Sequence, residues 1–175
     1  MKKVVLTFGL LSGALPITVM LLGLVFTGGG AHGSGSLILG WTVILLSSLF
    51  IFFGIKSYRD NYNNGVISFG KAFQVGILIT LISAVLYTIV WEIAFFNFMN
   101  DMMDGWFAAE AERLRTSGAS QAEIQGSLDM AVKYKTNPLY NAMFTILEPT
   151  TVTVPMTLIA SLVMKRKTKK EEAIA

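Results

Sequence analysis

The chain has 175 residues and a net charge of +3, and 53% of its residues are hydrophobic while only 14% are charged. A typical soluble domain is about 25% charged, and a soluble chain of this length cannot bury so much apolar surface. Composition therefore indicates one membrane-embedded domain, and the absence of cysteine with a single histidine excludes disulfides, cysteine nucleophiles and multi-histidine metal sites.

Four apolar segments predict an all-α integral membrane four-helix bundle that spans the bilayer at residues 4–26, 37–55, 72–99 and 139–164. The first two are uncharged, and each is long enough to cross a hydrocarbon core of about 30 Å as a helix. The third contains Glu92 and the fourth contains Glu148. Without the residues before Glu148 the fourth segment is too short to span, so we predict that both acids lie within the membrane.

The start of the chain has features of a signal peptide, because Lys2 and Lys3 precede an apolar run. The run is longer than the apolar region of a usual signal peptide, and no clear cleavage site follows it. We therefore expect an uncleaved first helix, with cleavage as the alternative.

The first two connections are short and polar. Residues 28–36 are rich in Gly and Ser and include His32, but they lack the Gly-Lys-Ser/Thr ending of a phosphate-binding loop. We predict a flexible link there, with His32 in solvent. In the second connection Asn64-Gly65 is a turn signal, and Ser68 is placed to cap the third helix.

The connection between the third and fourth spans, residues 100–138, predicts an amphipathic helical hairpin. A first helix ends near Gly118, and Ser120 with Glu123 forms a capping box that starts a second helix. The apolar faces consist of Met103, Phe107, Ala111 and Leu114, and of Ile124, Leu128 and either Ala131 or Val132. We expect the hairpin to cover the outer end of the bundle or to lie on the lipid surface, with docking of a partner as an alternative.

The distribution of Lys and Arg predicts that both termini are cytoplasmic. Basic residues gather at the N-terminus, in the second connection and in the tail 165–175, whereas the hairpin's basic residues are offset by acids. The basic tail predicts contact with anionic lipid at a bacterial inner membrane. It has no folded recognition element beside it, so nucleic acid is not an expected partner.

The intramembrane acids are the candidate polar site. Counted from the outer ends of their segments, Glu92 and Glu148 fall at similar depths, and Pro149 follows Glu148 directly. A proton- or cation-binding site is one interpretation, because proline frees a carbonyl one turn earlier and broken helices beside acids line transport sites. The alternative, which we favour, is that each acid is protonated or bonded to a neighbour, since four short helices leave little room for a pathway.

Gly9 and Gly13 form a small-residue pair that allows a second helix to approach closely, either in the same chain or in another copy. The sequence contains no metalloprotease motif, no nucleophile elbow and no pair of intramembrane aspartates. We therefore expect no enzymatic activity and no cofactor.

Four stretches of the chain resemble a bacterial family of small membrane proteins, the domain-of-unknown-function family 4199. They are residues 3–13, residues 58–73, residues 118–124, and the segment from Asn137-Pro138 through Glu148-Pro149 to the basic end. After Glu148-Pro149 the family pattern has a Pro-Val-Gly step, where this chain has residues 150–155, Thr-Thr-Val-Thr-Val-Pro. The resemblance implies a four-span membrane protein and assigns no activity or site residue.

Composition, motifs and resemblance together favour a non-enzymatic structural or partner-binding membrane component. It would act through a homo-oligomer or another membrane protein. The alternative function is a small proton- or cation-coupled carrier or channel that uses Glu92 and Glu148.

Overall fold

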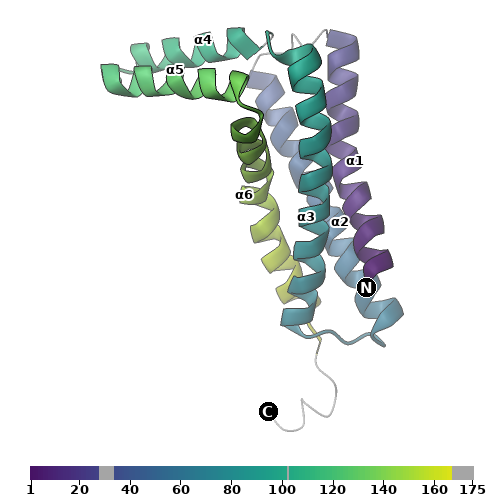
Figure 1. The fold of residues 1–175 in the computed structure, drawn as a ribbon. Helices are drawn as coiled ribbons and strands as arrows, with labels where there is room; N and C mark the ends of the chain where they lie inside the picture. The colour runs from purple at the N-terminus through teal and green to yellow at the C-terminus, as the bar shows by residue number, and fades with distance from the viewer. Residues whose placement is uncertain (28–33, 102, 167–175) are drawn as a thin grey trace.

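The computed structural model describes residues 1–27, 34–101 and 103–166. Four long helices stand side by side: α1 (Lys2–Thr27), α2 (Ser34–Tyr62), α3 (Phe69–Ala94) and α6 (Pro138–Met164) (Figure 1). Their membrane-compatible stretches are Lys2–Phe26, Ile38–Tyr62, Phe69–Met99 and Pro138–Met164, each long and apolar enough to cross a membrane. The predicted all-α, four-span architecture is confirmed.

The contacts between helices define the arrangement of the bundle. Helices α1 and α6 each pack against both α2 and α3, and α2 also contacts α3. The start of α1 and the end of α6 lie at the same end of the bundle, here called the terminal end (Figure 1). The opposite end, where α3 passes into the hairpin, is called the hairpin end.

Glycines bring these helices into close contact. A Cβ atom at Gly9 of α1 would lie 2.8 Å from the Ile82 side chain of α3, and one at Gly13 would lie 3.1 Å from Leu86. The small-residue pair therefore packs α1 against α3 of the same chain, which decides between the two neighbours that the sequence left open. Gly76 of α3 is equally constrained, since its Cβ would lie 2.7 Å from Thr157 of α6.

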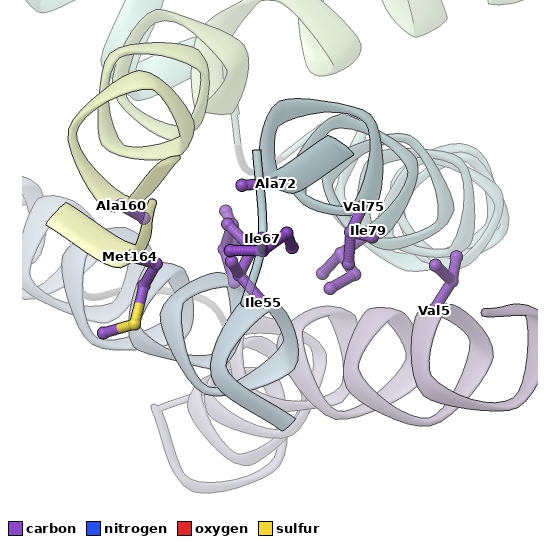
Figure 2. Packing of buried hydrophobic residues seen from close by; sticks show 9 residues of the cluster. Val5, Ile55, Ile67, Ala72, Val75, Ile79, Ala160 and Met164 are labelled. Atoms are coloured by element: carbon purple, nitrogen blue, oxygen red, sulfur yellow. The ribbon is translucent and has the colours of Figure 1, made fainter. Parts of the chain in front are cut away.

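The apolar core lies at the terminal end, where the short link between α2 and α3 enters the bundle (Figure 2). Ile67 of this link is fully buried. Its backbone pairs with Arg166 just after α6, through hydrogen bonds of 3.2 and 2.9 Å. This pairing holds together the end of α2, the start of α3 and the end of α6. The cluster consists of Val5, Ile51, Ile55, Ile67, Ala72, Val75, Ile79, Ala160 and Met164.

The predicted turn and caps are present. Asn64 and Gly65 adopt positive φ angles of 52° and 78°, and the Ser68 side chain accepts a hydrogen bond from the backbone N–H of Lys71. Helix α2 continues beyond Ile55, where the apolar run stops, as far as Tyr62. Near the end of α2, the Arg59 side chain remains packed within the bundle. It is only 8% exposed and pairs with Asp60 over 2.7 Å.

The hairpin is formed by α4 (Met103–Thr116) and α5 (Gln121–Thr136). The chain turns at Gly118, whose φ of +77° favours glycine, and Ser120 and Glu123 form the predicted capping box. Figure 1 shows that both helices extend sideways from the hairpin end, beyond the flank of the bundle and not across its end. The sequence predicted two possible placements of the hairpin, and the one in which it covers the outer end of the bundle is therefore not adopted. His32 and residues 167–175 of the tail lie outside the described residues.

Candidate functional site at the seam between α3 and α6

Two lines of small and polar residues face one another along α3 and α6. Both lines have a spacing of four residues, which places their members on one helical face. Their buried members are Ala72, Gly76, Thr80, Ala84 and Thr88 on α3, and Asn141, Thr145, Thr153, Thr157 and Ser161 on α6. The hydroxyl groups of Thr80 and Thr157 are 3.2 Å apart across this contact, which we call the seam.

Near the terminal end the seam is closed and internally satisfied. Thr153, Thr157 and Ser161 each donate a hydrogen bond to the carbonyl four residues earlier, at 2.9, 2.7 and 2.6 Å. Small side chains that satisfy their own hydroxyls let two helices approach closely in an apolar environment. This half of the seam is a packing contact.

At the hairpin end, Asn141 joins three elements. It is fully buried, and its Oδ1 accepts a hydrogen bond from the indole N–H of Trp91 on α3 at 2.9 Å. Its amide nitrogen donates to the carbonyl of Tyr134 on α5 at 3.1 Å, and its Oδ1 is also 3.2 Å from the hydroxyl of Thr145. Asn141 therefore holds the root of the hairpin against the bundle.

Aromatic rings surround the same joint. Trp91 stacks on Phe95, the first residue of the short π-helix η1 (Phe95–Met99), with ring centroids 5.8 Å apart. Tyr134 packs edge-on against Phe95 of η1, Phe107 of α4 and Phe144 of α6, at 5.3, 6.0 and 6.3 Å. Such contacts add to the stabilisation from burial, and they make the hairpin continuous with α3 and α6.

Glu92 continues the α3 line one turn beyond Thr88. Its Oε1 atom is buried without a hydrogen-bond partner, and so is the hydroxyl of Thr88, a residue only 7% exposed. Unpaired polar atoms are uncommon in buried positions, because leaving them unpaired costs about 1–3 kcal/mol each. Two of them on one face mark this part of the seam as different from the closed half.

Glu148 lies deeper along the seam than Glu92. The pairs Thr80–Thr157 and Trp91–Asn141 set the antiparallel register, which places Glu148 near the turn of α3 that contains Tyr87. Glu148 interacts electrostatically with Tyr87, in agreement with this register. The offset from Glu92 is about five residues of α3, roughly 7 Å at 1.5 Å per residue. Glu148 is also exposed on the flank of the bundle, whereas Glu92 is partly buried.

No described residue supplies a positive charge to either acid. The four ion pairs in the described part of the chain involve Asp60, Asp104, Glu110 and Glu112. Burial raises the pKa of Tyr134 in the hairpin. Tyr134 therefore remains a neutral phenol beside two carboxyl groups.

Pro149 lies on the α6 line between Thr145 and Thr153. Helix α6 runs without a break from Pro138 to Met164, through both Pro149 and Pro155, although the expected Pro-Val-Gly step is missing. Proline has no N–H, so Pro149 cannot donate the helical hydrogen bond to the carbonyl of Thr145. By the register above, this carbonyl belongs to the same level as Thr88 and Glu92.

A family model described as a protein of unknown function, DUF4199, matches residues 7–166. The chain belongs to the DUF4199 family. No curated protein and no solved structure matches this DUF4199 chain. The resemblance stated from the sequence is thus confirmed over nearly the whole chain. The family description carries no activity, so the function of this DUF4199 protein has to be argued from its geometry.

The sequence drew attention to Glu92, Glu148 and Pro149 but not to the seam itself. Thr88, Asn141 and Tyr134 were not singled out as parts of one site. The signal for Thr88 and Asn141 was the four-residue spacing of Thr, Ser and Asn on the fourth span, matched by the spacing of Ala, Gly and Thr on the third; no such spacing marked Tyr134.

Proposed function

We propose that this DUF4199 protein is a non-enzymatic membrane component that binds another membrane protein through the hairpin α4–α5. The observation that carries the proposal is the direction of the hairpin, which extends beyond the bundle instead of packing on it (Figure 1). A neighbouring membrane protein beside the bundle would lie within reach of this arm. The joint at Asn141 and Tyr134 supports a fixed arm and not a loose loop.

The surface of the arm is consistent with a protein partner. Three large apolar side chains on it are exposed: Trp106 by 41%, Met130 by 49% and Val132 by 60%. Aromatic residues and methionine are enriched at protein interfaces. A groove of about 420 Å³ runs between α4 and α5 and is bordered by the ion pair of Asp104 and Lys135.

The arrangement in the membrane is part of this proposal. The terminal end carries Lys2, Lys3, Lys56, Lys165 and Arg166, and such an excess favours the cytoplasmic side. The hairpin then lies outside the cytoplasm, at the outer surface of a bacterial inner membrane. The basic terminal end and tail would contact anionic lipid of the inner leaflet.

Site-specific photo-crosslinking in native membranes tests the partner. A photoreactive residue is placed at Trp106 or Met130, and at Val85 on the exposed flank of α3 as a control. We expect discrete crosslinked species from the two hairpin positions and none from Val85. Differently tagged copies show whether the species contains a second copy of the chain. Absence of any species from the hairpin positions would refute the proposal.

A second candidate function is a small proton- or cation-coupled carrier, which the unpartnered Oε1 of Glu92 favours. Its test is ion flux in liposomes between about pH 5 and pH 8. Flux that is lost with Glu92→Gln or Glu148→Gln supports transport, and the absence of flux from the wild-type protein rules it out.

A further inference from the structure

We propose that Thr88, Glu92 and the main-chain carbonyl of Thr145 form a binding site for one small monovalent cation that prefers oxygen ligands, either a hydronium ion or Na⁺. The inference specifies the site of the second candidate function. Binding at equilibrium does not require transport, so it stands if no flux is found.

The hydroxyl of Thr88 is unpaired, unlike those on the facing line of α6. Thr145, Thr153, Thr157 and Ser161 satisfy their hydroxyls with a carbonyl of their own helix. Thr88 is as buried as these residues, and its hydroxyl has no partner. Glu92 is one turn further along α3, where side chains four residues apart have Cβ atoms about 6 Å apart. Its unpaired Oε1 is therefore a neighbour of Thr88, and one small guest reaches both.

The carbonyl of Thr145 on α6 forms the opposite wall of the site. The carbonyl of Thr145 lacks its usual donor because residue 149 is proline. The register of the seam puts Thr145 across from the segment between Thr88 and Glu92. All three groups offer oxygen atoms, and two of the three only accept hydrogen bonds. A guest that donates hydrogen bonds in several directions, or a hard cation, matches this set.

The charge balance of the site favours a monovalent cation. Glu92 has no ion-pair partner among the described residues, and it interacts electrostatically with Tyr134 of α5, which also interacts with Glu148 of α6. An uncompensated carboxylate within the membrane is costly. A monovalent cation would neutralise it, whereas a divalent metal would leave a net positive charge within the membrane. Among the described residues no group of three or more His, Cys, Asp or Glu side chains is present.

Thermal unfolding of the full chain in lipid nanodiscs tests the inference, because a ligand that binds the native state raises Tm. One arm replaces choline chloride by NaCl at about pH 8, and the other lowers the pH from about 8 to about 5 without sodium. We expect one arm to raise Tm by about 3 °C or more. The rise should be lost in Glu92→Gln, reduced in Thr88→Val and retained in the control Thr153→Val.

A rise with sodium identifies Na⁺. A rise with acid alone identifies hydronium if Thr88→Val reduces it, because protonation of the Glu92 carboxylate by itself does not need the Thr88 hydroxyl; an acid-induced rise that is unchanged in Thr88→Val overturns the site. No rise in either arm, or an equal rise in Glu92→Gln, overturns the site. If Glu92→Gln does not fold, isotope-edited infrared spectra of the wild-type glutamates replace it. The carboxyl band must then respond to sodium or to pH, and must respond differently in Thr88→Val; an unchanged band contradicts the inference.

Discussion

The indole N–H of Trp91 donates a hydrogen bond to Oδ1 of Asn141 over 2.9 Å, and this bond ties α3 to the first turn of α6 at the root of the hairpin. Asn141 is fully buried, and its amide nitrogen also donates a hydrogen bond to the carbonyl of Tyr134 on α5. One amide thus organises the third span, the fourth span and the arm between them.

Replacing Asn141 by leucine should therefore destabilise the protein. The substitution keeps the volume roughly constant but leaves the Trp91 N–H and the Tyr134 carbonyl unpaired, at a cost of about 2–6 kcal/mol. Thermal or denaturant unfolding in nanodiscs measures the change. Asn97→Leu is the matched control, because Asn97 is exposed and bonds only to the carbonyl of Ile93. Equal stability of the two variants would show that Asn141 does not join the three elements.

Gly9→Val should weaken the contact between α1 and α3. Its Cβ would lie 2.8 Å from Ile82, so one of the helices must shift, and overpacking of this kind typically costs about 1–3 kcal/mol. Gly40→Val on α2 is the control, since a Cβ there meets nothing within 4 Å. The unfolding free energies of the two variants are compared. If Gly9→Val instead changes oligomeric state without loss of monomer stability, the assignment of Gly9 to an intrachain contact is wrong.

The start of α5 should depend on pH through Glu123. The backbone N–H and the hydroxyl of Ser120 both donate hydrogen bonds to the carboxylate of Glu123. These bonds lower the pKa of Glu123 below 4.5. A carboxyl whose pKa is lowered on folding stabilises the folded form above its unfolded pKa, and this stabilisation is lost as the pH falls through the folded value. Amide hydrogen exchange in the first turn of α5 should thus accelerate, relative to the intrinsic rate, below about pH 4.5. Glu123→Gln should abolish the effect, and an unaltered profile in that variant would exclude the capping box as its cause.

The ion pair of Lys135 and Asp104 should contribute little to the stability of the hairpin. It joins α5 to the start of α4, but Asp104 is 63% exposed, and surface pairs contribute about 0.2–1 kcal/mol. A double-mutant cycle with Asp104→Asn and Lys135→Gln measures the coupling energy. Coupling well above this range would show that the pair holds the two helices of the arm together.

Much of the fold was predictable because local chemistry determines it. Uncharged apolar runs require helices in a bilayer. The turn at Asn64-Gly65 and the caps at Ser68 and Ser120 depend on residues close in sequence. The sequence could not assign a neighbour to Gly9 and Gly13, since a small face fits any helix.

The candidate site was less predictable because it depends on register. Counting from the ends of their segments gave Glu92 and Glu148 similar depths. The contacts of Thr80 with Thr157 and of Trp91 with Asn141 set an offset of about five residues, roughly 7 Å. Thr88 escaped notice because an unpaired hydroxyl is visible only when its surroundings are known. The direction of the hairpin likewise follows from long-range contacts of Asn141 and Tyr134, which no local pattern encodes.

The direction of the hairpin is the claim on which the proposed function depends, and a distance across the molecule tests it most directly. Because the chain has no cysteine, spin labels can be placed through Ser117→Cys at the tip of the arm and Phe26→Cys on α1 near the hairpin end of the bundle. An arm that extends sideways, away from α1 as in Figure 1, predicts a separation above about 30 Å, since α4 alone is roughly 20 Å long. A dominant separation below about 20 Å would place the hairpin across the end of the bundle and contradict the account.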